Sequence, residues 1–457
     1  MVIKNYILKI LEKNIFEHLF FILLGILAIV FYNERLYADS GYYIFKVINN
    51  ENFWVEHNRY ILILSQLFPL IAVKLGFGLK AVLYIYSVGH VFFFYCIFLI
   101  SRYIYKDKYA GLLLILIQTL GIMSGFFVPM FELYYSTALL ILFISILYHS
   151  NIRKNFIILL ILTFFILTAH LYSFILFLFI LVLHAEEFKL KHIKLYIFFL
   201  LMMTGLFILK KYTASEYEQA KANDFISTLK NGVYNFDYIK SLSAFIWEYY
   251  KELLFIEIIT IGILLFSKEF LKSFLIGVAF IGTLAMINIS AYGFEHTRYQ
   301  EQVYFPLSFV AAYPFLFYVI KNKNIFIKII FSFVVFIIIV FRINGITTDS
   351  EKFTGRVEEM KSLIEKARQN GGCKYIVHES SLIFDSNWSY PIETMLLSSS
   401  DNENSVTICT KEDIDFNQNR TTLTPNKYLF RKWDIYYITS LNKNYFKLEN
   451  SEYKDFN

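Results

Sequence analysis

Asp39 is a residue whose type and position suggest acid–base chemistry. It follows an apolar stretch from about Ile15 to Tyr32 and lies in the segment Tyr-Ala-Asp-Ser-Gly-Tyr-Tyr. A carboxylate in this position can take the proton from an attacking hydroxyl group. The alternative is a structural role, because Asp is a common N-cap residue and a short helix is predicted over residues 41–50.

A second group of ionisable residues lies between residues 293 and 306. Arg298 is suited to binding phosphate, because its planar guanidinium group contacts phosphate oxygens in pairs and stays charged. His296 is a candidate second donor to the phosphate, and Glu295 is a candidate for positioning a substrate. The alternatives for Arg298 are an ion pair with Glu295 or Glu301, or contact with a lipid phosphate. Glu295 and His296 lack the spacing of a metal site, so no metal-ligating residues are predicted.

Four more residues are candidates for positioning a substrate. His170 interrupts a long apolar stretch over residues 156–184, and a helix broken inside a membrane must be buried in protein or line a cavity. The alternative for His170 is helix capping or packing. Glu132 can hold a hydroxyl group or stabilise the start of the next helix. Tyr42 and Tyr43 can stack on sugar rings or belong to the aromatic belt at a membrane surface.

The elements that must position these residues follow from the composition. Of the 457 residues, 57% are hydrophobic, 19% are aromatic and 18% are charged. A soluble domain carries about 25% charged residues and about 45–50% apolar ones. Apolar stretches of about 20 residues, long enough to cross a hydrocarbon layer of about 30 Å, recur up to about residue 342. The sequence therefore predicts an all-α polytopic membrane protein with about 11 transmembrane helices, formed by residues 1–342.

The positions of Lys and Arg in short turns predict the orientation of the chain. Lys4, Lys9 and Lys13 precede the first apolar stretch, so the N-terminus is expected in the cytoplasm and the protein in the inner (cytoplasmic) membrane, crossing it several times. Residues 60–75 are expected to lie at the interface, and a true span there would reverse the early topology. On this map the candidate residues share the outer side, which is the main evidence for a site.

Residues 343–457 differ in character from the rest of the chain. They are polar and have no stretch long enough to span a membrane. Helical periodicity is present over residues 357–369, and short strands are expected at residues 374–378 and 405–409. An odd number of spans places this part outside the cell. The sequence thus predicts a small extracytoplasmic C-terminal α/β domain.

Several classes of protein are excluded by what the sequence lacks. The net charge of +6 comes from lysines and arginines at membrane turns, so nucleic-acid binding is not predicted. The sequence has no Gly-rich nucleotide loop, and therefore no evident site for a cytosolic nucleotide donor. Only three cysteines occur, which excludes a disulfide framework. Two of them, Cys373 and Cys409, can pair outside the cell or remain separate thiols.

This pattern resembles the C-type (GT-C) membrane glycosyltransferases, which use polyprenyl-phosphate-linked sugars. Members have many spans, a long first outer loop with interfacial helices, and an acidic residue soon after the first span, which Asp39 resembles. The break at Ala169-His170-Leu-Tyr is similar to the short paired helices of the family. Arg298 resembles the family's phosphate-binding basic residue, and many members end in a soluble outer domain.

The resemblance implies an inverting transfer of a sugar to an extracytoplasmic glycan, lipid or protein. Asp39 would deprotonate the acceptor hydroxyl, which attacks the anomeric carbon while the polyprenyl phosphate leaves. Arg298, with His296 or a lysine of the loop expected over residues 210–240, would neutralise the phosphate. The donor would enter from the surrounding membrane lipids. Because Ser follows Asp39 where some members have a second carboxylate, the need for a divalent cation is left open.

Two other functions remain as alternatives. An O-antigen-type polymerase or ligase also has many spans and a large outer loop, but such enzymes place several arginines in outer loops and Arg is sparse here. A membrane transporter or lipid flippase is expected to have repeated halves and charged or broken helices near the membrane centre. No internal repeat is evident in this sequence.

Overall fold

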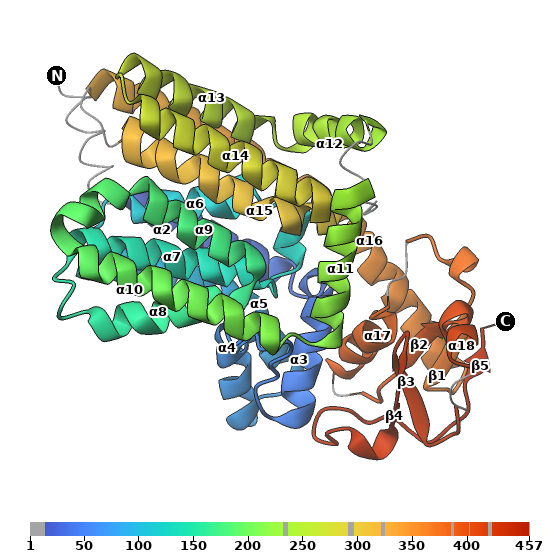
Figure 1. Cartoon of the computed structure of the whole chain (residues 1–457). Helices are drawn as coiled ribbons and strands as arrows, with labels where there is room; N and C mark the ends of the chain where they lie inside the picture. The colour runs from blue at the N-terminus through green and yellow to red at the C-terminus, as the bar shows by residue number, and fades with distance from the viewer. Residues whose placement is uncertain are drawn as a thin grey trace.

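The computed structural model of the chain describes residues 14–231, 236–290, 297–320, 325–384, 388–401, 403–418 and 423–456. Within these ranges the protein is mostly helical, with a small α/β region at its C-terminal end (Figure 1). The predicted fold class is confirmed at this level of description.

The helices form a bundle in two layers. The first ten helices of the described chain are, in order, α2 (Ile15–Val30), α3 (Asp39–Asn50), α4 (Leu62–Lys74), α5 (Leu79–Leu99), α6 (Ala110–Leu120), α7 (Glu132–His149), α8 (Phe156–Ala169), α9 (Leu171–Leu183), α10 (Ala185–Tyr212) and α11 (Glu216–Asn231). They are followed by α12 (Phe236–Tyr249), α13 (Lys251–Phe266), α14 (Phe270–Ser290), α15 (Thr297–Pro314) and α16 (Ile325–Gln369). Helices α13, α14 and α15 pack together as one layer against the others (Figure 1).

Five helical segments in the described ranges are long and apolar enough to cross a membrane. They are Leu79–Ile104, Glu132–His149, Ile193–Tyr212, Phe270–Ile289 and Ile330–Gln369. Other predicted spans correspond to shorter apolar helices of 10–17 residues, among them α2, α6, α8 and α9. Several helices able to span a membrane are therefore present, and the finer count of about 11 spans stays a prediction.

Helix α6 is shorter than the sequence suggested. The predicted span ran from residue 110 to residue 127, but the α-helix ends at Leu120 and a 3-10 turn follows at Ser124–Phe127. Gly121 is the C-cap residue of α6, and a Cβ atom there would come within 2.8 Å of Ser308 Oγ. This close approach to α15 requires a glycine, and the chain leaves the α-helix there.

Two expected interruptions are present. Residues 60–75 form α4, whose 13 residues pack against α3 and α5. A helix of that length rises about 20 Å, which is too short for a hydrocarbon layer of about 30 Å. The apolar stretch over residues 156–184 divides at His170 into α8 and α9, as predicted.

The segment after residue 210, expected to be a loop, is helical. Helix α10 continues to Tyr212 and is followed by α11, which has Glu216 and Glu218 in its first turn and Lys230 in its last. These charges suit the helix dipole, although the segment is too polar to show an apolar periodicity. Helix α11 crosses the ends of the bundle helices on the side that faces the C-terminal region (Figure 1).

The C-terminal region is a small α/β region, as the sequence predicted, and its three-stranded sheet is parallel. Strand β1 (Lys374–Val377) pairs in parallel with β2 (Thr407–Thr410) and β5 (Lys454–Asp455). Strands β3 (Lys427–Arg431) and β4 (Asp434–Tyr437) form an antiparallel hairpin. Two helices, α17 (Tyr390–Ser399) and α18 (Lys411–Gln418), complete the region. Cys373 and Cys409 are separate, buried thiols.

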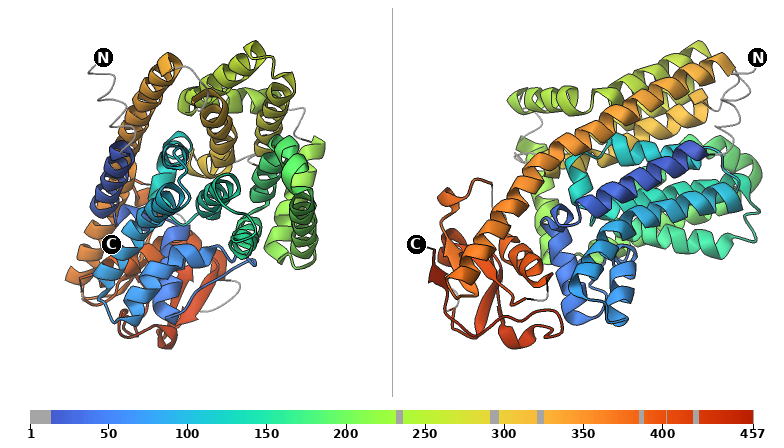
Figure 2. Two further views of the ribbon diagram at one scale, coloured as in Figure 1. Left: turned by 90° about the vertical axis from the view of Figure 1, so that its left-hand side faces the viewer. Right: turned by 180° about the vertical axis from the view of Figure 1, so that it is seen from behind.

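Helix α16 joins the two parts of the chain. Its 45 residues are apolar in the first half and polar in the second, so the boundary expected between residues 342 and 343 lies inside one continuous helix. Figure 2 shows it running from the bundle into the C-terminal region. A single apolar cluster includes side chains of α3, α4 and the start of α5 together with side chains of the C-terminal region.

Lys374, the first residue of β1, links the parallel sheet to neighbouring segments of the C-terminal region through its side chain. Its side chain is 1% exposed, and Nζ donates hydrogen bonds to the carbonyl oxygens of Pro425, Lys427 and Ser451 at 2.6, 2.7 and 2.9 Å. We expect Lys374→Met to lower the free energy of unfolding of the C-terminal region by about 1–3 kcal/mol, because it removes the charged donor of three partly buried hydrogen bonds. Thermal unfolding and limited proteolysis would measure the loss. The exposed Lys443→Met is the control, and equal stability of the two variants would contradict the assignment.

Candidate active site

Polar and charged side chains from six segments distant in the sequence meet at one end of the bundle, beside α3. The segments are the start of α3, the loop between α3 and α4, the start of α7, the break between α8 and α9, the end of α10 and the start of α11. In Figure 1 this is the place where α3 and α11 lie between the bundle and the C-terminal region. We call this group the outer charged site.

Arg59 lies at the centre of the outer charged site. Its Nη1 atom donates to Glu132 Oε1 at 2.8 Å, and its Nε atom lies 3.7 Å from Glu218 Oε1. Burial alone would lower the pKa of Arg59, but the charge of Glu132 and the hydrogen bond to it raise that pKa. The guanidinium group therefore stays charged, and Glu132 serves as its partner as well as occupying the first position of α7.

Lys210 is the second cation of the site. It comes from the last turn of α10, and its Nζ atom lies 3.9 Å from the same Glu218 oxygen. Both cation contacts to Glu218 are longer than hydrogen bonds. In addition, Arg59 Nε is buried and has no hydrogen-bond acceptor among the described residues. Two positive groups thus share one loosely held carboxylate, which is an arrangement that a phosphate can tighten.

His170 lies close to both cations. It caps α9, because its Nδ1 atom accepts a hydrogen bond from the backbone N–H of Tyr172 at 3.2 Å. It is also within electrostatic reach of Arg59 and Lys210. The capping role left open by the sequence is therefore present, and it holds the imidazole at the edge of the outer charged site.

Glu56 organises the aromatic side of the site. Its Oε1 atom accepts hydrogen bonds from Tyr42 Oη at 2.5 Å and from Trp54 Nε1 at 3.0 Å, and Tyr43 Oη is 3.4 Å from Oε2. Burial and the neighbouring Glu56 raise the pKa of Tyr42. The hydroxyl groups of the two tyrosines of α3 therefore both contact the same carboxylate.

Asp39 opens α3 next to these tyrosines. The N-cap position belongs to Ala38, and no side chain caps the helix, so Asp39 does not have the N-cap role that was its structural alternative. Burial raises the pKa of Tyr43, and the charges of Glu132, Glu56 and Asp39 raise it further. Tyr43 thus stays a protonated donor in the electrostatic field of three carboxylates.

The structure brings together five of the residues chosen from the sequence, namely Asp39, Tyr42, Tyr43, Glu132 and His170. Two others, Glu295 and His296, lie outside the described residues. Arg298 falls in the first turn of α15, where only the backbone is described. The sequence placed Glu56 and Arg59 among the ionisable residues of the first outer segment, but neither they nor Glu218 were chosen as site residues.

A second buried polar group lies near the start of α15. Glu301 accepts a hydrogen bond from Tyr250 Oη at 2.8 Å and another from the backbone N–H of Gly125. Nearby, Arg342 Nη2 pairs with Glu252 Oε2 at 3.0 Å. These contacts connect α13, α15, α16 and the turn after α6. They give the buried carboxylate of Glu301 two hydrogen-bond donors and the buried Arg342 an ionic partner.

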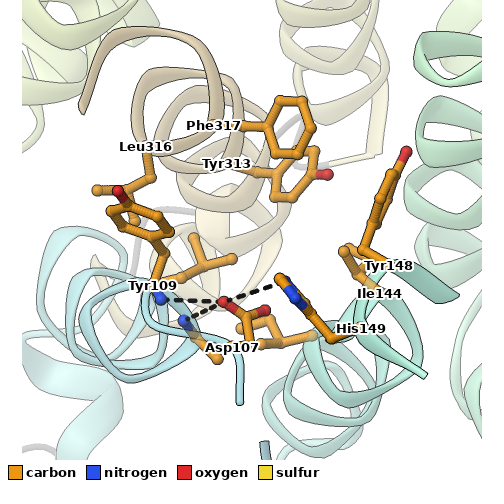
Figure 3. A pocket seen from close by; sticks show the side chains of 11 residues that line it. Asp107, Tyr109, Ile144, Tyr148, His149, Tyr313, Leu316 and Phe317 are labelled. Carbon is orange, nitrogen blue, oxygen red and sulfur yellow. Dashed lines mark hydrogen bonds and ion pairs between the residues drawn. The ribbon is translucent and has the colours of Figure 1, made fainter. Parts of the chain in front are cut away.

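A small pocket lies at the other end of the bundle (Figure 3). Its acidic residue, Asp107, accepts hydrogen bonds from the backbone N–H groups of Tyr109 and Ala110 at 2.9 and 3.3 Å and from Ser145 Oγ at 2.8 Å. His149 Nε2 is 3.9 Å away. Asp107 therefore caps the start of α6. Glu132 and His149 are at opposite ends of α7, so this pocket is separate from the outer charged site.

The described residues contain no group of three or more His, Cys, Asp or Glu side chains arranged to hold a metal ion. No family model matches the chain, and no curated protein or solved structure matches it. The fold and the site define a mostly helical protein with several helices able to span a membrane and a group of acidic, basic and aromatic side chains at one end of them.

Proposed function

We propose that the protein is an integral-membrane glycosyltransferase that transfers a sugar from a polyprenyl-phosphate donor to a hydroxyl group of an extracytoplasmic acceptor. The acceptor is a cell-surface glycan, lipid or protein. The observation that carries the proposal is the outer charged site, where Glu132 of α7 and Glu218 of α11 lie beside Arg59 and Lys210. The charge of Asp39, at the start of α3, acts on Tyr43, which is also under the influence of Glu132 and Arg59. A base and a pair of phosphate-binding cations are the groups that this reaction needs.

In the proposed reaction Asp39 accepts the proton of the acceptor hydroxyl. The hydroxyl oxygen forms a bond to the anomeric carbon, the bond between that carbon and the phosphate oxygen breaks, and the polyprenyl phosphate leaves with both electrons. The configuration at the anomeric carbon is inverted. Tyr42, Tyr43 and Glu132 hold the sugar hydroxyls, and the hydrogen bonds of the tyrosines to Glu56 fix their rings for this role.

The leaving phosphate is bound by Lys210 and Arg59 in this proposal. Both cations lie within 4 Å of Glu218 Oε1 but beyond hydrogen-bond distance, at 3.9 and 3.7 Å. The donor phosphate can displace the Glu218 carboxylate and form shorter, charge-assisted hydrogen bonds. Arg298 and His296, which the family resemblance suggested for the same task, remain further candidates.

The orientation of the protein in the cytoplasmic membrane is part of the proposal. Lys106, Lys108, Arg153 and Lys154 belong to the turns at the end of the bundle that holds Asp107. Short turns rich in Lys and Arg face the cytoplasm, so the outer charged site and the C-terminal region face outward. A donor lipid flipped to the outer leaflet would then reach the site from the side.

The function is tested by mass spectrometry of cell-surface glycans from cells with and without the gene, combined with a transfer assay on the purified protein in nanodiscs. We expect loss of one sugar from a surface glycan and transfer from a polyprenyl-phosphate donor in the assay. A change in polymer length with unchanged sugar composition would favour the polymerase alternative. Movement of the lipid-linked sugar across vesicles without transfer would favour a flippase.

A further inference from the structure

The C-terminal region contacts α3 along its whole length, from the residue before Ala38 to Asn49. The Arg356 guanidinium lies 4.9 Å from the centre of the Tyr37 ring, just before the helix. In the middle of the helix, the Phe45 and Phe446 rings stack with their centres 4.6 Å apart. At its end, the backbone N–H of Asn442 donates to Asn49 Oδ1 at 2.8 Å. The helix that begins with Asp39 is therefore positioned by residues more than 300 positions later in the chain.

The turn that leads into Asp39 has an unusual backbone. Ala38 has φ of 52° and ψ of −120°, and the N–H of Ser40 donates to the Tyr37 carbonyl oxygen at 3.2 Å. These are the features of a type II′ turn with Ala38 at its first central position, where glycine is the usual residue. An alanine there is strained because its Cβ atom disfavours positive φ. A contact from outside the turn must therefore stabilise the positive φ of Ala38.

Glu393 of α17 provides that contact. Its Oε1 atom accepts the backbone N–H of Ala38 at 2.9 Å and Ser389 Oγ at 2.5 Å, while Oε2 pairs with Arg356. The Glu393 side chain is 2% exposed. A Cβ atom on Gly41 would lie 3.3 Å from Glu393 Cγ and 2.3 Å from the Leu36 carbonyl oxygen, so the close approach requires a glycine at that position.

We propose that Glu393, fixed by Arg356, is a positioning residue for Asp39. Its hydrogen bond to Ala38 keeps the turn in the strained geometry that directs the Asp39 carboxylate into the outer charged site. The C-terminal region is thus a part of the active site. The catalytic role of Asp39 in this inference rests on the proposed function. The stabilisation of the turn by Glu393 rests on the observed hydrogen bond to Ala38.

The test is Glu393→Ala in the full-length protein. Hydrogen exchange of the peptide covering residues 36–45 should become faster, because the turn is released. The kcat for sugar transfer should fall about 100-fold with little change in KM for the donor, since a displacement near 1 Å costs that much. Adding Ala38→Gly should restore most of kcat, because glycine adopts positive φ without strain. A residue needed only for folding would not be rescued in this way.

The exposed Glu403→Ala is the matched control and should leave exchange and kcat unchanged. If Glu393→Ala does not fold, Glu393→Gln keeps an acceptor oxygen for Ala38 and should give smaller changes in the same direction. Unchanged exchange of residues 36–45 in a folded Glu393 variant would overturn the proposal. A wild-type protein without transferase activity would refute the proposed function. If exchange were nevertheless faster in the Glu393 variant, the stabilisation of the turn by Glu393 would still be supported.

Discussion

Asp39→Asn is expected to abolish sugar transfer, with a fall in kcat of about 100- to 10,000-fold, the range for loss of a positioned general base. The amide has the size of the carboxyl group but cannot accept the proton of the acceptor hydroxyl. The transfer assay in nanodiscs, with a polyprenyl-phosphate sugar as donor, measures the effect. KM for the donor should change little, because Asp39 acts on the acceptor.

The same substitution should leave folding intact. Asp39 is not the N-cap of α3, and its favourable interaction with the helix dipole is worth about 0.3–1 kcal/mol. The control is Asp415→Asn, which changes an exposed carboxylate of α18 and should have no effect on transfer. Full activity of the Asp39 variant would remove this residue from the mechanism, and a large loss of thermal stability would show that its role is structural.

The sequence predicted those features that depend on local patterns. The break at His170 follows from an apolar stretch too long for one helix, and β1 and β2 follow from short β-branched and aromatic segments. Asp39 was found because it comes soon after an apolar stretch. These predictions need no knowledge of which segments meet in space.

Contacts between distant segments were not predictable in this way. The pairing of Arg59 with Glu132 joins a loop to a helix 73 residues later, and the hydrogen bond from Ala38 to Glu393 joins residues 355 apart. No periodicity in a single sequence encodes such pairs. Residues 216–231 were expected to belong to a loop but form α11, which has no buried side chain. Glu218 in its first turn lies near Arg59 and Lys210, and the helix also packs against α14, which is again a contact between distant segments.

The start of α11 contacts both candidate phosphate-binding cations and also His57. Its Glu218 touches both candidate phosphate-binding cations, and the neighbouring Ser215 holds the imidazole of His57 through a contact of 2.8 Å. Burial and the charge of Arg59 lower the pKa of His57, so the imidazole is neutral at pH 7 and adds no charge to the site. The positive charge offered to a phosphate therefore comes from Arg59 and Lys210.

Lys210→Met tests the contribution of Lys210 to phosphate binding while Arg59 stays in place. Arg59 is unsuitable for a first test, because its removal leaves Glu132 buried without its partner and destabilises the fold. Within the described ranges Lys210 has one ion pair, the 3.9 Å contact with Glu218, and methionine preserves the length of its side chain. We expect kcat/KM for the lipid-linked donor to fall about 100- to 1,000-fold, as for loss of one group that stabilises developing charge.

The neighbouring Lys211→Met is the matched control, because Lys211 is exposed on the same helical turn. Both variants lose one positive charge and one ammonium group at the same depth, so any general effect on membrane insertion or lipid attraction applies to both. A selective loss in the Lys210 variant thus reports on the site. Equal activity of the two variants would exclude Lys210 from phosphate binding and direct the search to Arg298 and His296.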